Sequence, residues 1–145
     1  MGSVTTLIAV ALALGAAPAS ARNTFHDLDV AKAKAEGHGR ENLQDVPVFM
    51  AGEKHAPVAQ DLGVSRANRS TNAANKSDEK ACQIAFLSAV IALQAKARAL
   101  GADAVVDVRS ITKNNDLESA TQYRCVAGAF VANVALSGRM VKFEK

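Results

Sequence analysis

Two cysteines are the residues of this chain with the most reactive side chains. Cys82 and Cys125 lie too far apart in the sequence to form a C-x-x-C redox pair, so their spacing favours a structural disulfide over an oxidoreductase site. The alternative is that both thiols stay reduced and pack in the core as small apolar side chains. The choice between the two depends on the compartment in which the protein resides.

The other residue types give no catalytic constellation. The three histidines, His26, His38 and His55, lack the i, i+4 spacing that places two metal ligands on one helical face, so we interpret them as exposed loop residues. A hydrolase or redox enzyme would need a nucleophile such as Ser110 or Tyr123 beside one of them. We predict no catalytic residue, no metal site and no cofactor.

Acidic side chains offer a weaker alternative. Asp103 and Asp107 lie at an even spacing in a segment with strand-like alternation, so we expect them on the same face of a sheet. Together with Glu118 they could bind a cation weakly. A solvated strand face explains the same residues without a ligand, and we favour that interpretation.

Basic side chains form a modest strip of Arg66, Arg69 and Lys76, which could contact phosphate or lipid headgroups but is equally well explained by a polar edge strand. The sequence holds 17 basic and 14 acidic residues, and its net charge of +3 is unremarkable for solubility. It has no Trp and a single Tyr, so a stacking platform for bases is poorly supplied. We predict no nucleic-acid partner.

The N-terminus has the pattern of a secretory signal. Residues 7–17 form an apolar stretch and an A-x-A motif ends at Ala21, so we expect cleavage between Ala21 and Arg22. The pattern departs from a typical signal in one respect, since residues 1–6 contain no Lys or Arg. We predict a signal peptide over residues 1–21 and a soluble periplasmic protein that has no transmembrane segment after cleavage.

A long helix over about 78–100 is the element that positions the rest of the chain. Ser77 is a good N-cap and Gly101 a good C-cap, and between them apolar residues recur at steps of three and four. Residues 81–95 carry no charge, which indicates burial on more than one side, by the N-terminal segment or by a partner subunit. The helix is too short and too polar to span a membrane.

Alternating and β-branched residues predict strands on both sides of this helix. The predicted strands cover residues 46–51, 63–71, 102–112, 122–136 and 140–143, with a bulge at Gly128 and a turn at Ser137-Gly138. We therefore predict an α+β fold of about four antiparallel strands with the long helix packed across the sheet. The single domain spans residues 45–145, and residues 22–44 form a poorly defined N-terminal arm.

This topology brings the two cysteines to the same side of the domain. The strand after the helix runs back towards the helix N-terminus, where Cys82 lies, and Cys125 lies early in the next strand. A bridge is therefore sterically plausible, and it would persist in an oxidising periplasm. The chain entropy of the loop that it closes corresponds to about 4 kcal/mol of stabilisation. We favour the disulfide.

Three motifs, KSDEKAC, LGADAVVDV and CVAGAFV, carry a resemblance that covers residues 48–136. The chain resembles a family of short exported proteobacterial proteins that are often labelled as the ATPase component of an ABC-type excinuclease. More distantly, it is similar to the small heavy-metal-binding-domain family, whose members form ring oligomers, and to the Rcs stress-sensor lipoprotein domain, which has disulfides. Cys125 and its neighbours match a strand of that sensor, whereas the sensor's lipid-bearing cysteine has no counterpart here.

A DNA-repair role conflicts with the residues present. A nucleotide-hydrolysing protein needs a G-x-x-x-x-G-K-[ST] loop, and the chain contains no Gly-Lys dipeptide. We therefore expect a non-enzymatic periplasmic binding, sensing or assembly module, with a second copy of the chain or another envelope protein as its partner. The alternative is a small periplasmic enzyme or a metal-binding protein, and an excinuclease role is the least expected.

Overall fold

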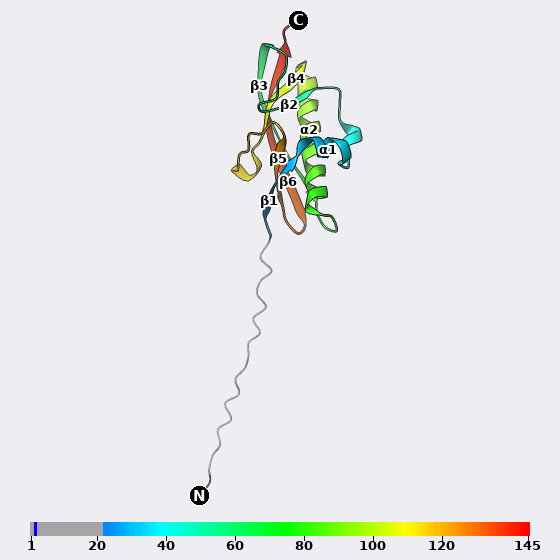
Figure 1. Ribbon diagram of the computed structural model, residues 1–145, viewed down its shortest axis with the longest axis vertical. Helices are drawn as coiled ribbons and strands as arrows, with labels where there is room; N and C mark the ends of the chain where they lie inside the picture. Colours follow the sequence, from blue (N-terminus) through cyan, green and yellow to red (C-terminus); the bar gives the residue numbers. More distant parts are fainter. Residues whose placement is uncertain (1, 3–21) are drawn as a thin grey trace.

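The computed structural model describes residue 2 and residues 22–145, so the predicted signal peptide over residues 1–21 lies outside the described residues apart from residue 2. The chain folds as a mixed six-stranded sheet with both helices on one of its faces (Figure 1). In chain order the elements are β1 (Thr24–Asp29), α1 (Val30–Glu36), a 3-10 turn (Arg40–Asn42), β2 (Val48–Met50), β3 (Val58–Asn72), α2 (Asp78–Leu100), β4 (Ala104–Ser110), a second 3-10 turn (Thr112–Asn114), β5 (Gln122–Ala127) and β6 (Val131–Phe143).

The central strand of the sheet is β6. It pairs with β3 on one side, and on the other side its first half pairs with β5 and its second half with β4. β1 then extends the sheet beyond β5, and β2 pairs in parallel with β4. The predicted α+β class, with a long helix across a sheet, is confirmed. The sheet has six strands rather than about four, and the β2–β4 pair makes it mixed rather than purely antiparallel.

The strand predicted over residues 122–136 is two strands joined by a turn. The amide of Gly128 donates to the carbonyl of Val131 at 2.8 Å, so the chain reverses there instead of continuing through a bulge. The turn predicted at Ser137-Gly138 is also wrong, because β6 runs straight through it. A Cβ at Gly138 would lie 2.5 Å from Val105 Cγ1, so this glycine permits a close approach of β6 to its neighbours.

A bulge in β4 changes which of its side chains face the helix. Strict alternation predicts that Val106 and Val108 share one face. Asp107 has a φ of 53°, and the pairing of β4 with β6 shifts at this point. Val105 and Val108 consequently pack into the main core, whereas Val106 packs on the other face with Val141.

The N-terminal arm, which the sequence left undefined, forms β1 and α1. β1 pairs with β5 in an antiparallel ladder from Thr24 to Asp29, and the side chain of Asp29 caps α1 by accepting from the amide of Ala31 at 3.1 Å. Val30 and Ala33 then join the main core. This segment is stabilised by its pairing with β5, which is distant in the sequence. Its own residues, many of them polar, do not by themselves predict a strand.

The long helix α2 ends where the sequence predicts. Ser77 Oγ accepts from the amide of Lys80 at 3.1 Å, and Gly101 closes the helix with a φ of 69°. The chain after α1 covers one flank, where the side chain of Gln94 bonds to the backbone of Gln44 and Val46. Part of the predicted burial on more than one side is thus provided by the N-terminal segment.

Length and composition alone would allow α2 to cross a membrane, contrary to the sequence-based expectation. Half of its most apolar stretch is buried inside the domain, and its central stripe, including Phe86, Leu93 and Ala97, is fully enclosed by the sheet. This is the arrangement of a core helix.

Candidate binding pocket

The two cysteines form a disulfide in the centre of the domain. The Cys82 and Cys125 sulfurs are bonded at 2.14 Å, the Cα atoms are 5.8 Å apart, and both residues are fully buried. The bridge fastens the second turn of α2 to β5. One turn further along, the ring of Phe86 stacks on that of Tyr123 with centroids 4.0 Å apart. The predicted disulfide is confirmed, and its burial indicates a structural role.

Neither predicted nucleophile lies at an accessible site. Ser110 is fully buried, and its Oγ accepts from the amide of Arg124 at 2.8 Å. Tyr123 is fully buried too, and its hydroxyl has no hydrogen-bond partner among the described residues. Burial, with smaller effects of Glu79 and Asp29, raises the pKa of this phenol. No hydrogen bond in the described chain joins either residue to a histidine.

The three histidines lie in three different places. His26 Nε2 is 2.9 Å from Asp78 Oδ2, and the ring of His55 packs beside Phe49 and Phe143, with centroids 5.7 and 6.0 Å away. His38 lines a pocket beside α2. Within residues 22–145, no group of three His, Cys, Asp or Glu side chains is arranged to hold a metal ion.

The carboxylates considered for a cation site have other partners. Asp103 Oδ2 accepts from the amide of Phe143 at 2.8 Å. Asp107 forms a bidentate pair with Arg109 at 2.7 and 2.8 Å, and Glu118 pairs with the same guanidinium. Asp103 therefore has a different partner from the other two, and the three carboxylates form no metal-binding group among residues 22–145.

The residues of the predicted basic strip do not act together. Lys76 Nζ and Arg69 Nη1 each donate to nearby backbone carbonyls, those of Asn72 and Asn68. Arg66 lines a hollow of about 510 Å³ on the sheet face opposite the helices, together with Arg109. The polar edge strand predicted here is confirmed as part of β3, which pairs only with β6 among the described strands.

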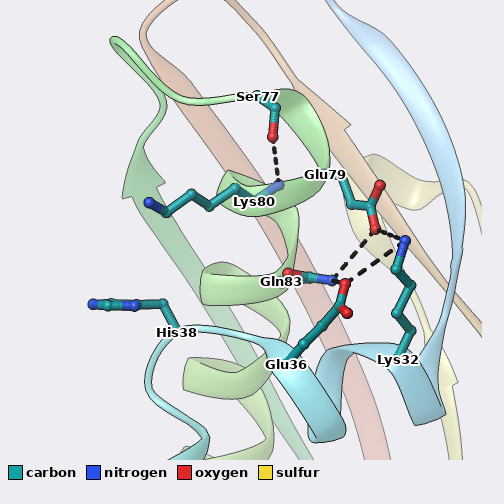
Figure 2. A pocket seen from close by; sticks show the side chains of 7 residues that line it. All are labelled: Lys32, Glu36, His38, Ser77, Glu79, Lys80 and Gln83. Atoms are coloured by element: carbon teal, nitrogen blue, oxygen red, sulfur yellow. Dashed lines mark hydrogen bonds and ion pairs between the residues drawn. The ribbon is translucent and has the colours of Figure 1, made fainter.

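A polar pocket of about 430 Å³ lies between α1 and the first turns of α2 (Figure 2). This volume lies within the range of small-molecule sites. The pocket is lined by Lys32 and Glu36 of α1, His38 of the following turn, the N-cap Ser77, and Glu79, Lys80 and Gln83 of α2. The elements that form it are the predicted helix and the arm that the sequence left undefined.

Gln83 is the most unusual residue of this pocket, because its polar side chain is only 6% exposed. Its Nε2 donates to Glu36 Oε1 and Glu79 Oε1, both at 3.5 Å. This arrangement directs Oε1 away from the two carboxylates, to the side where Lys80 and His38 extend (Figure 2). Among the described residues, no group donates a hydrogen bond to that oxygen.

The charges of the pocket are separated into two sides. Lys32 Nζ pairs with Glu79 Oε1 at 2.6 Å and with Glu36 Oε1 at 3.6 Å, and the hydrogen bond to Glu79 raises the pKa of Lys32. On the other side, Lys80 Nζ has no ion-pair partner within the described chain, and it lies at the positive end of the α2 dipole. The pocket therefore combines an acceptor-rich side with a cationic side.

Sequence reasoning recognised His38 and the cap residue Ser77 but did not assemble this pocket. Gln83 gave one usable signal, since it is a polar residue inside the uncharged stretch of α2. Its partners Lys32 and Glu36 lie in the N-terminal arm, and only the fold brings them to α2.

Comparison of the chain with protein-family models, with curated proteins and with solved structures finds no match. The family resemblance described from the sequence therefore stays a prediction, and the function is inferred from the geometry of the site.

Proposed function

We propose that this chain is an exported, non-enzymatic binding module of the cell envelope, whose pocket between α1 and α2 receives a small zwitterionic ligand such as a free amino acid. The observation that carries this proposal is Gln83, a buried amide held by two carboxylates with its oxygen left unpaired. Oε1 faces the open pocket, so a ligand that supplies an N–H or O–H group can take the place of solvent at an acceptor that the fold leaves free.

The chemistry of the walls supports a ligand that carries both charges. An ammonium group is complementary to Gln83 Oε1, whereas the carboxylates of Glu36 and Glu79 lie on the other side of that amide and pair with Lys32. A carboxylate is complementary to the ammonium of Lys80 and to the ring of His38. Because the paired Lys32 already offsets part of the acidic side, a doubly charged cation is less complementary than a zwitterion.

The disulfide supports the same proposal by ordering the pocket in advance. Cys82 is the residue before Gln83, and its bridge to β5 fixes that turn of α2. A site that is already ordered loses less conformational entropy on binding. Export agrees with this arrangement, because buried disulfides are typical of oxidising compartments and the N-terminal sequence resembles a secretory signal.

The test is a thermal-shift and calorimetric titration of the purified protein with glycine, L-alanine, L-lysine and L-glutamate. We expect saturable binding of a neutral zwitterion, and loss of binding in Gln83→Met, which keeps the size of the side chain and removes its polar atoms. Lys80→Gln should weaken binding by removing the cationic side. Lys142→Gln, which changes an exposed lysine of β6 outside this pocket, is the matched control. Absence of binding to all four probes, or equal binding by Gln83→Met, would overturn the proposal.

A further inference from the structure

Exposed apolar side chains gather at one end of the molecule. The tip of the β5–β6 hairpin carries Phe130, 75% exposed, and Val131, 52% exposed, and Phe25 of β1 is 44% exposed. These are three of the six large apolar residues that are exposed in the described chain. The hairpin turn and the start of β1 lie at the same end in Figure 1.

Pairing in the sheet places these residues close to one another. Phe25 is the antiparallel partner of Val126 in β5, two residues before the hairpin turn. Val131 follows directly after that turn and pairs with Asn72 at the end of β3. Gly128, which lies between them, has no side chain, and a Cβ at this position would lie 2.8 Å from the carbonyl of Arg22.

The turn itself does not need an aromatic residue. Its geometry is held by backbone bonds, from Gly128 to the carbonyl of Val131 and from Ala73 to the carbonyl of Phe130, both at 2.8 Å. The ring of Phe130 therefore adds apolar surface that the folded domain leaves in water, which is unfavourable by the usual area relation. A solvent-exposed aromatic residue at a loop tip, beside other apolar residues, is typical of a contact surface.

Cations flank this apolar tip. Lys76 lies in the loop that the Ala73–Phe130 bond joins to the hairpin, and Lys80 lies one turn into α2. An exposed apolar tip with lysines beside it is complementary to the interfacial region of an anionic bilayer. Aromatic rings insert into that region, and ammonium groups bind the lipid phosphates.

We propose that this end of the domain docks on an anionic phospholipid surface, with the ring of Phe130 entering the interfacial layer. The course of the chain supports the same orientation. Arg22, at the start of the described fold, lies against the hairpin at Gly128, and the apolar stretch over residues 7–17 precedes it in the sequence. The segment that leads into the domain therefore reaches it at this end. The proposal shares Lys80 with the pocket between α1 and α2, and its test therefore uses Phe130 and Lys76, which lie outside that pocket.

The chain contains no Trp, so a single introduced Trp reports on its own position. We would prepare Phe130→Trp and, as a matched control at the other end of α2, Leu100→Trp, whose site is 51% exposed. Each variant is mixed with phosphatidylglycerol vesicles, with phosphatidylcholine vesicles, and with vesicles of brominated lipid. We expect a blue shift and bromine quenching at position 130 on phosphatidylglycerol only, with neither at position 100.

Sedimentation with the same vesicles gives the size of each contribution. Phe130→Ser should weaken binding roughly tenfold, and Lys76→Gln roughly fivefold at low salt, with smaller effects as salt is raised. Unchanged emission at position 130 would overturn the proposal. So would a shift at both positions, because it would mean that the whole domain adsorbs or unfolds on the lipid.

Discussion

The side of α2 that meets the sheet and the flank that meets α1 are built in opposite ways. On the sheet side, the disulfide and the stacked rings of Phe86 and Tyr123 fill a fully buried core. On the flank, the same turns of the helix present Gln83 and Lys80 to an open polar pocket. The sheet side of α2 is therefore closely packed against the rest of the fold. On the flank, the amide oxygen of Gln83 and the ammonium group of Lys80 have no partner among the described residues.

This difference separates stability from binding. Side chains on the sheet side lose packing when they are altered, so their substitutions should act on the free energy of unfolding. The flank keeps hydrogen-bonding capacity that the fold does not use, so its substitutions should act on ligand affinity. Four experiments test this separation.

The largest effect is expected from removal of the disulfide. The double variant Cys82→Ala, Cys125→Ala should lose about 4 kcal/mol of unfolding free energy, because the unfolded chain regains the entropy of the open loop. Urea denaturation followed by circular dichroism measures this loss. An unfolding free energy equal to that of the oxidised protein would contradict the stabilising role of the bridge.

The next effect concerns the close approach of β6 beneath α2. Gly138→Ala places a methyl group 2.5 Å from Val105 Cγ1 and 3.1 Å from Val108 Cγ2, so stability should fall by about 1–3 kcal/mol. Ser137→Ala, one residue earlier on the same strand, is the control and should change stability little. If both variants denature at the same urea concentration as the parent, the packing described for β6 is wrong.

Two unpaired polar groups allow a direct comparison of the two sides. Tyr123→Phe removes a buried hydroxyl without a partner among the described residues, so it should stabilise the protein by about 1 kcal/mol and leave binding unchanged. Gln83→Met should change stability less and abolish binding. Paired denaturation and calorimetry of the two variants measure both quantities. A loss of binding in Tyr123→Phe would contradict the claim that the sheet side of α2 governs stability and not binding.

The smallest effect is expected at the start of α2. Hydrogen bonds from Arg22 and then from His26 hold the pKa of Asp78 below its usual value of 3.8. A carboxyl with a lower pKa in the folded state contributes stability above the unfolded pKa and loses it as the pH falls through the folded value. Asp78→Asn should therefore flatten the decline of stability below about pH 4. Asp45→Asn, at an exposed site outside the ion pairs of the described residues, is the control. Equal acid profiles for the parent and Asp78→Asn would contradict the ion pair.

Features governed by neighbouring residues were predictable from the sequence. Ser77, Gly101 and the apolar periodicity between them determine α2 locally, and the structure has the same bounds. The disulfide followed from the position of Cys82 near the helix start and of Cys125 early in the next strand. The α+β class followed from these two elements.

Features governed by distant contacts were not predictable. The sequence does not distinguish a glycine in a hairpin turn, such as Gly128, from a glycine that allows close packing of side chains within a strand, such as Gly138. The bulge at Asp107 depends on how β4 pairs with β6. The pocket forms only when α1 packs on α2, and no local pattern in residues 22–44 predicts that contact.

The most direct test of the account is the side-chain amide signal of Gln83 in a ¹⁵N correlation spectrum, assigned by its disappearance in Gln83→Met. Titration with glycine or L-alanine should move this signal saturably, together with the backbone amides of Lys80 and His38, and leave the amides of β3 unchanged. A Gln83 signal that stays in place at millimolar concentrations of every amino acid tested would contradict the proposal that the α1–α2 pocket is a ligand site.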